Sequence, residues 1–220
     1  MINFVHIPKT AGLSVKKACF ENPFIPIRYK NHRADVSNIR QSMVILRNPV
    51  DRFVSSVSYI TDCSLGKKKI MPTFVSPKKL QKVKSLHASG ITNANDWVNQ
   101  LRNKDKYHKV IRDIYKNNET SGRGHCNIGS NICENIFLFE SQSSWCNSPS
   151  FILIFDRVKH EIEKLLSKLG SNIDLPHENK SVNKQRISRK NYAWLENFYA
   201  KDFQLYYNYK AKNLDERIFI

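Results

Sequence analysis

Cysteine is scarce in this sequence of 220 residues, and its spacing is irregular. The five cysteines form no CxxC pair and no cysteine–histidine spacing of the kind that holds a metal. Structural zinc sites depend on such spacing, so we expect no bound metal. The odd count leaves at least one thiol free, which suits a reducing compartment better. A disulfide bridge among Cys126, Cys133 and Cys146 stays possible.

Long apolar runs are lacking too. No stretch approaches the ~20 apolar residues that a membrane span needs, and no signal peptide precedes the first apolar run at residues 2–7. We therefore expect no membrane span. The sequence as written predicts a cytoplasmic or otherwise soluble protein, or one of the Golgi lumen if an N-terminal anchor has been removed.

Acidic residues are few. The 19 Asp and Glu stand against 36 Lys and Arg, and the net charge of +17 points to a negatively charged partner. Nucleotides, acidic glycans, nucleic acid and anionic membranes all qualify, and charge alone does not choose among them.

The 40% of apolar residues and the twelve Phe indicate a globular protein. We expect a single domain over residues 1–220, with a basic and helical insertion at 62–130 and a basic connection at 171–190.

Apolar strand patterns alternate with helical patterns along the chain. Four short apolar runs are predicted as strands: 2–7, 24–28, 43–46 and 151–155. Five amphipathic segments are predicted as helices: 13–20, the segment that begins at Pro49, 94–117, 157–169 and 191–209. Asp156 is expected to cap the fourth helix and Gly170 to end it. This alternation predicts an α/β fold with a mainly parallel central sheet flanked by helices.

The first candidate motif is HIPKTAGLS at residues 6–14, between the first predicted strand and helix. Ligands of α/β sheets bind where strands end, and N–H groups at a helix start can cradle an anion. Lys9 adds a positive charge, and Thr10 and Ser14 add hydroxyl donors. The motif is not a Walker A loop, because its lysine precedes the glycine. An ordinary tight turn fits its composition nearly as well.

The second candidate motif is RNPVDRFVS at residues 47–55. Arg47 ends a predicted strand and Ser55 lies two turns into the helix that follows, so both can converge on one anion. Arginine binds phosphate with a fork of two donors, and serine adds a third. The alternative is that Arg47 or Arg52 pairs with Asp51 or with another carboxylate.

Together the two motifs resemble the family of sulfotransferases that use 3'-phosphoadenosine 5'-phosphosulfate (PAPS). IPKTAGxS resembles the 5'-phosphosulfate loop of that family, and RNPxxRxxS resembles its 3'-phosphate motif, in which aspartate is commoner than Asn48. The strand at 151–155 with its helix, and LPHENKS at 175–181, are similar to the branch of glycan (heparan sulfate) 2-O-sulfotransferases. The resemblance spans most of the chain and is weakest over 62–130.

This resemblance implies a P-loop-like three-layer sandwich that transfers a sulfuryl group from PAPS to an acceptor hydroxyl, in this branch on a carbohydrate. Six consecutive residues would hold the 5'-phosphosulfate: Lys9, Thr10, Ala11, Gly12, Leu13 and Ser14. Arg47 and Ser55 would hold the 3'-phosphate. Lys9 would also stabilise the charge that builds on the leaving oxygen, so the reaction would need no metal.

The acceptor hydroxyl needs a base, and histidine titrates nearest to neutrality. His32 is the candidate, because it precedes the strand at 43–46 by about the distance at which this branch places its catalytic histidine. A surface histidine in a polar run is the equally weighted alternative. Glu21 and Asp35 are possible substitutes.

Asp202 is a carboxylate on the apolar face of the last predicted helix. A buried carboxylate needs a partner. We interpret Asp202 as structural, holding a basic residue near the site, rather than as catalytic.

Two basic segments predict an anionic glycan as the acceptor: the lysine-rich run 67–84 and the connection 180–190. A solvated loop is the alternative interpretation of the lysine run.

Two other functions compete with the sulfotransferase. A kinase-like phosphotransferase lacks its GK[ST] sequence here, and a basic nucleic-acid-binding protein lacks a recognised motif, so nucleic acid is not expected. A protein-tyrosine acceptor stays open.

Overall fold

The computed structural model describes residues 1–30, 41–64, 92–103, 141–146, 149–176 and 185–218. Contacts group the chain into two compact units. The first unit draws on residues 1–52, 141–180 and 199–220, and the second on 53–140 and 181–198. Helix α2 (Pro49–Ser64) begins in the first unit and continues into the second.

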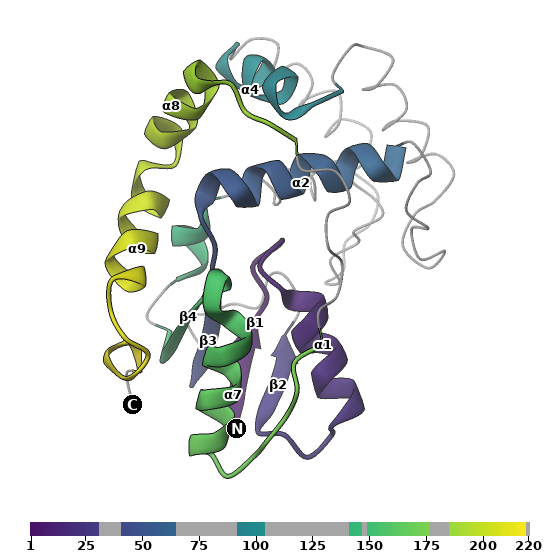
Figure 1. The fold of residues 1–220 in the computed structure, drawn as a ribbon, viewed down its shortest axis with the longest axis vertical. Helices are drawn as coiled ribbons and strands as arrows, with labels where there is room; N and C mark the ends of the chain where they lie inside the picture. The colour runs from purple at the N-terminus through teal and green to yellow at the C-terminus, as the bar shows by residue number, and fades with distance from the viewer. Residues whose placement is uncertain (31–40, 65–91, 104–140, 147–148, 177–184, 219–220) are drawn as a thin grey trace, which may run out of the picture. The chain divides into compact units, whose positions relative to one another are not determined.

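Four strands of the first unit form one sheet in the described part of the chain (Figure 1): β1 (Ile2–Val5), β2 (Ile27–Lys30), β3 (Ser42–Leu46) and β4 (Phe151–Ile154). Their order is β2-β1-β3-β4, and every neighbouring pair is parallel. In this register Phe4 pairs with Met43, and Met43 with Phe151. The predicted α/β fold with a parallel sheet is confirmed. The chain passes from β1 to β2 on one side and returns to β3 on the other, so the strand order reverses between β1 and β3.

One face of the sheet carries the main hydrophobic core. Helices α1 (Gly12–Glu21) and α7 (Val158–Lys168) both pack on this face. The strands supply alternate residues to it: Ile2, Phe4, Met43, Ile45, Phe151 and Leu153. Of the residues that alternate with these, Asn3 is half-buried and five apolar residues are fully buried: Val5, Val44, Leu46, Ile152 and Ile154. A parallel sheet buried on both faces explains why its strands are continuous apolar runs, and it is consistent with a three-layer α/β sandwich.

Local sequence signals set the ends of two helices as predicted. Asn48 caps α2, because its Oδ1 accepts the N–H of Val50 at 3.0 Å and that of Asp51 at 3.2 Å. Helix α7 ends at Lys168 with Leu169 as its C-cap, and Gly170 follows with a left-handed φ of 74°. The N–H of Ser171 then donates to the carbonyl of Leu166 at 2.9 Å, the bond that closes a Schellman motif.

The start of α7 differs from the prediction. Asp156 does not cap this helix; it lies in a short 3-10 turn, η3 (Phe155–Arg157), and α7 begins at Val158. Its carboxylate instead accepts bonds from Tyr206 and Lys210. Tertiary partners far along the chain have thus replaced the local helix N–H groups.

Two further boundaries were predicted wrongly. The last predicted helix is two helices, α8 (Arg189–Phe198) and α9 (Ala200–Lys210), interrupted at Tyr199 with φ −104° and ψ 28°. The second strand starts at Ile27, after Pro26 rather than before it. Proline lacks the N–H that a strand would use, so the ladder begins one residue later.

The second unit contains helices α4 (Ala94–Arg102) and α8, which contact each other. Asn93 caps α4 in a capping box with Asp96, so the predicted start at residue 94 is confirmed. Arg102 Nη1 donates to Asn191 Oδ1 at 3.1 Å and joins the two helices. Residues 104–117 of the predicted helix and the lysine run 67–84 lie outside the described residues.

Candidate functional site

The two sequence motifs meet at one edge of the sheet. The segment 6–14 follows β1 and Arg47 follows β3, and these strands are hydrogen-bonded neighbours. Because they are parallel, their carboxyl ends lie at the same edge. The strand order reverses between them, and such a reversal is where open α/β sheets bind ligands.

The loop after β1 has an unusual backbone. Lys9 and Ala11 both adopt a left-handed conformation with φ of 67°, which costs a non-glycine residue about 1 kcal/mol or more. Thr10, fully buried between them, donates its hydroxyl to the carbonyl of Ile7 at 2.7 Å. Left-handed residues in a tight loop can turn successive N–H groups toward one point and form a nest for an anion.

The first turn of α1 adds further N–H donors. The first four N–H groups of a helix have no partner within it. Ala11 occupies the N-cap position of α1 and its side chain makes no capping hydrogen bond, and no acidic residue lies in the first turn of this helix. Helices α2 and α4, in contrast, are capped by Asn48 and Asn93. The uncapped start of α1, with Ser14 buried in its first turn, can accept an anion at the positive end of the helix dipole.

Arg47 joins the two motifs. Its Nη1 donates to the carbonyl of Lys9 at 3.1 Å, and its guanidinium lies 4.2 Å from the centre of the Phe155 ring. Its Nε is buried and has no hydrogen-bond partner among the described residues. Burial lowers the pKa of Arg47, while the carboxylates of Asp51 and Asp156 oppose that shift, and arginine stays protonated. The side chain is therefore a partly buried cation with a donor still to be used.

Arg52 also reaches the first motif. It is 2% exposed, and its Nη1 lies 3.5 Å from the carbonyl of Pro8, at the outer limit of a hydrogen bond. The alternative drawn from the sequence was a pair with Asp51. For Arg47 the hydrogen bond goes to the loop carbonyl instead, and Asp51 acts on it only through its charge.

His6 packs directly over the start of α1. Its Nδ1 lies 2.6 Å from the Tyr29 hydroxyl, and its ring stacks on Phe4 with centroids 5.9 Å apart. A Cβ placed at Gly12 would lie only 1.8 Å from His6 Nε2. Gly12 is therefore required because an imidazole ring occupies the space that any larger side chain would fill.

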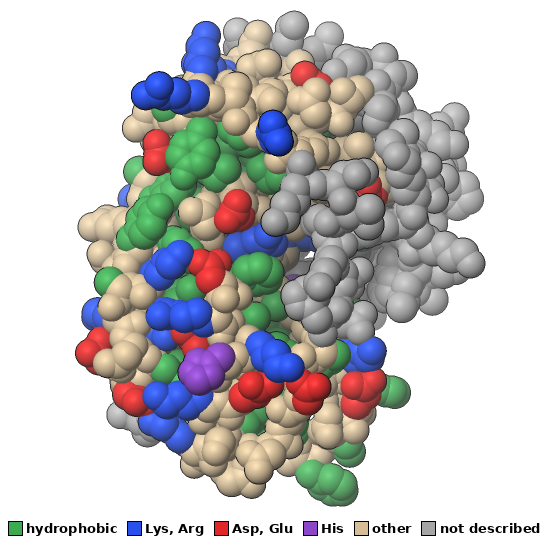
Figure 2. Space-filling view, viewed as in Figure 1, with side chains coloured by type: hydrophobic (Ala, Val, Ile, Leu, Met, Phe, Trp, Pro, Cys, Tyr) green, Lys and Arg blue, Asp and Glu red, His purple; other side chains and the backbone are tan. Residues whose placement is uncertain are grey.

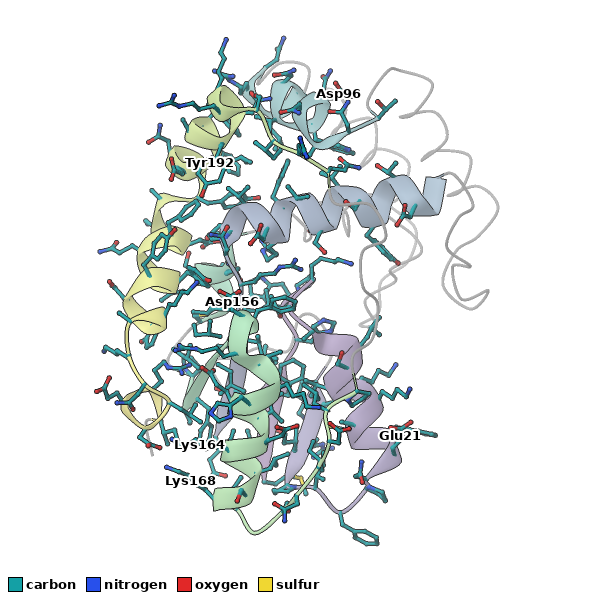
Figure 3. The ribbon with its side chains drawn as sticks, viewed as in Figure 1. Glu21, Asp96, Asp156, Lys164, Lys168 and Tyr192 are labelled. Atoms are coloured by element: carbon teal, nitrogen blue, oxygen red, sulfur yellow. The ribbon has the colours of Figure 1, made fainter. Side chains whose placement is uncertain are left out.

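The other predicted site residues are distributed as follows. Leu13 is half exposed on α1, and Ser55 is buried on α2 in the second unit, three residues after Arg52 and so on the same side of that helix. Glu21 ends α1 at the far end from the loop, ~14 Å from Gly12 at 1.5 Å per residue (Figure 3). This distance argues against Glu21 as the base. His32 and Asp35 lie outside the described residues.

Three residues outside both motifs support the site. Phe155 stacks on the Arg47 guanidinium, and the buried Gln142 hydrogen-bonds the Arg47 main chain. Asp202 holds Gln142 through its main-chain N–H. The sequence interpretation of Asp202 as structural agrees with this, although its partners in the described chain are N–H groups and a hydroxyl, not a basic residue. Burial on an apolar helix face was the only sequence signal for this group.

Asp156, two residues after the end of β4 (labelled in Figure 3), forms a charged cluster with Tyr206 and Lys210 of α9. Its Oδ2 accepts from Tyr206 and from Lys210 Nζ, both at 2.7 Å. Burial acts to raise the pKa of Asp156, but these two hydrogen bonds outweigh it and the pKa lies below its ordinary value. Burial raises the pKa of Tyr206 to about 12, and the bond to Asp156 raises that of Lys210. The cluster therefore holds an ionised carboxylate against its own cation.

Comparison with protein-family models, with curated proteins and with solved structures finds no match to this chain. Within the described ranges no group of three or more His, Cys, Asp or Glu side chains is arranged to hold a metal ion. Over the same ranges, none of the helices combines the length and the apolar character needed to cross a bilayer.

Proposed function

We propose that this chain is a sulfotransferase that moves the sulfuryl group of PAPS to an acceptor hydroxyl on a carbohydrate. One observation carries the proposal: Arg47 bonds the loop of the first motif while its own Nε remains buried and without a partner in the described chain. A buried donor is costly unless an acceptor pairs with it, and a cationic donor pairs most strongly with an anion. Because RNPxxRxxS resembles a 3'-phosphate motif, we propose that this anion is the 3'-phosphate of PAPS.

The donor would span the two motifs. Its 5'-phosphosulfate would lie against the loop of Lys9 to Ser14, where the left-handed backbone and the uncapped start of α1 supply N–H donors. Thr10 would contribute its main-chain N–H, because its hydroxyl donates to Ile7. The resemblance assigns the 3'-phosphate to Arg47 and Ser55. The all-parallel sheet supports an α/β sandwich, and the finer P-loop-like assignment is part of this proposal.

The transfer step uses these residues in defined roles. The acceptor oxygen attacks sulfur and loses its proton to a base, for which His32 is the candidate. The bond from sulfur to the bridging oxygen breaks, and its electron pair stays on the 5'-phosphate of the product, 3'-phosphoadenosine 5'-phosphate (PAP). Lys9 would stabilise that leaving charge, which is worth roughly 3 kcal/mol for a single well-placed donor.

The one departure from the family motif is neutral for this proposal. Asn48 stands where aspartate is commoner, and its side chain caps α2. Asparagine and aspartate are equally good at that position. The substitution therefore changes a helix cap and not a phosphate contact.

The two rival functions differ in the ligand that they require. A kinase-like protein would bind ATP, and a nucleic-acid-binding protein would need a coherent basic surface. On the face shown in Figure 2, the Lys and Arg side chains of the described residues are interspersed with Asp and Glu. This pattern offers no support for a nucleic-acid interface. An anionic glycan acceptor remains the proposal for the basic segments.

Calorimetric titration of the full chain with PAP, ATP and duplex DNA tests the assignment. We expect PAP alone to bind, and radiolabelled PAPS to label a glycan in a panel of glycans, peptides and small alcohols. Arg47→Ala should weaken PAP binding about tenfold to a hundredfold, and binding of adenosine 5'-phosphosulfate much less. Arg28→Ala, which removes an exposed arginine from β2, is the matched control. Binding of ATP with no preference for PAP, or equal losses for both nucleotides in Arg47→Ala, would overturn the proposal.

A further inference from the structure

The main chain of Arg47 is held by a single side chain from a distant segment. Gln142 begins the 3-10 turn η2 (Gln142–Trp145) and is fully buried. Its Oε1 accepts the N–H of Arg47 at 3.0 Å, and its Nε2 donates to the carbonyl of Arg47 at 2.8 Å. Leu46 forms the last pair of the ladder with Ile154, so Arg47 is the first residue beyond it. The carboxamide of Gln142 makes the two main-chain hydrogen bonds to Arg47 that a neighbouring strand would otherwise make.

Gln142 is itself fixed by Asp202. This carboxylate is 1% exposed in the first turn of α9. It accepts the N–H of Gln142 at 2.7 Å, the N–H of Ser143 at 2.9 Å and the hydroxyl of Ser141. These donors satisfy the buried charge, and its place at the start of η2 suits the positive end of a helical turn.

We propose that Gln142 is a positioning residue for the anion site: it fixes the Arg47 main chain so that the guanidinium is aimed before a ligand arrives. The identity of that ligand as a 3'-phosphate rests on the proposed function. The guanidinium already has two other restraints, the carbonyl of Lys9 and the ring of Phe155. With its backbone fixed as well, Arg47 loses less conformational freedom on binding.

The chemistry of the carboxamide makes the role specific to glutamine. Only an amide offers one acceptor and one donor at this spacing. Gln142→Glu keeps the acceptor for the Arg47 N–H but places an oxygen against the Arg47 carbonyl. Gln142→Leu removes both bonds, so the two variants should form a graded series.

The test compares the full-length wild type with Gln142→Glu, Gln142→Leu and Asp202→Asn. The control is Ser144→Ala, an exposed residue of the same turn. Amide hydrogen exchange at Arg47, followed by NMR without ligand, measures how firmly the Arg47 main chain is held. Titration with PAP and with adenosine 5'-phosphosulfate measures the affinity of the site for each nucleotide.

We expect exchange at Arg47 to accelerate at least about tenfold in Gln142→Leu and less in Gln142→Glu. Affinity for PAP should fall about tenfold in Gln142→Leu, while that for adenosine 5'-phosphosulfate and all values for Ser144→Ala stay unchanged. The idea fails if folded Gln142 variants keep the preference for PAP that Arg47→Ala loses. It also fails if both nucleotides are lost in parallel with thermal stability. A wild type that binds no PAP would instead overturn the proposed function, and this inference with it.

Discussion

Replacing Gly12 by alanine should damage the loop through His6. The new Cβ would lie 1.8 Å from His6 Nε2, 1.9 Å from Cδ2 and 2.2 Å from Cε1. Non-bonded heavy atoms settle at about 3.5–4.0 Å, so the ring has to move by roughly 2 Å. A shift of that size breaks the 2.6 Å bond to the Tyr29 hydroxyl.

The expected cost has two parts. Forcing extra atoms into a packed site costs about 1–3 kcal/mol, and the lost bond to Tyr29 adds about 1 kcal/mol. Gly12→Ala should therefore lower the free energy of unfolding by about 2–4 kcal/mol. For a chain of this length that corresponds to a fall in Tm of roughly 5–15 °C.

Urea unfolding of a double-mutant cycle measures this contact. His6→Ala removes the ring, so adding Gly12→Ala to it should cost nothing further, and the coupling energy should equal the full cost of Gly12→Ala, about 2–4 kcal/mol. Gly170→Ala is the matched control, because its Cβ meets no atom within 4 Å and its cost arises from the φ of 74° alone. That cost should be about 1–2 kcal/mol and should not change when His6 is replaced. Additive losses for Gly12 and His6, or a Gly12→Ala variant as stable as the wild type, would refute the reasoning.

Three further perturbations test separate parts of the fold. Asn48→Ala should cost about 1 kcal/mol in urea unfolding and Asn48→Asp almost nothing, since only alanine removes the cap; equal costs would contradict it. Glu161→Gln should cost about 3–5 kcal/mol, because the fully buried Arg217, whose Nη2 lies 2.6 Å from Glu161 Oε1, loses its counter-charge. Adding Arg217→Met should recover much of this loss, and no recovery would argue against a buried-charge penalty. The pKa of Asp156 is depressed below its ordinary 3.8 by its bonds to Lys210 and Tyr206, so its stabilisation is present above about pH 4 and is lost as the pH falls further. Urea midpoints between pH 6 and pH 2 should therefore fall less steeply for Asp156→Asn than for the wild type, and parallel profiles would contradict this.

The sheet and its two flanking helices were predictable because their signals are local. The apolar run of β3, the proline that starts α2 and the glycine that ends α7 each act within a few residues. The meeting of the two motifs was implied by the family resemblance, and in the structure it follows from the strand order, because β1 and β3 are parallel neighbours whose carboxyl ends lie together. The contact between Arg47 and the Lys9 carbonyl is a product of that topology.

The supports of the site were not predictable, because they depend on contacts between distant segments. Gln142 is 95 residues from Arg47 in the sequence, and nothing in its local sequence distinguishes it. Asp156 looked like a helix cap because it precedes an amphipathic segment, but Tyr206 and Lys210 of α9 compete for its carboxylate. No local signal around Gly12 indicates that the ring of His6 fills the space beside it.

The loop after β1 is stabilised by side-chain donors that face its main-chain carbonyl groups. Three successive carbonyls face side-chain donors: that of Ile7 accepts from Thr10, that of Pro8 lies near Arg52, and that of Lys9 accepts from Arg47. These contacts offset the cost of two left-handed residues without using the N–H groups of the loop. An anion would then find those donors already oriented, which is the condition under which electrostatic stabilisation costs no reorganisation. Arg47 has both roles, because one nitrogen holds the loop and another is buried with no partner in the described chain. Its replacement should therefore loosen the loop and weaken anion binding together, whereas loss of Thr10, whose hydroxyl only holds the loop, should loosen the backbone and leave the charge of the site intact.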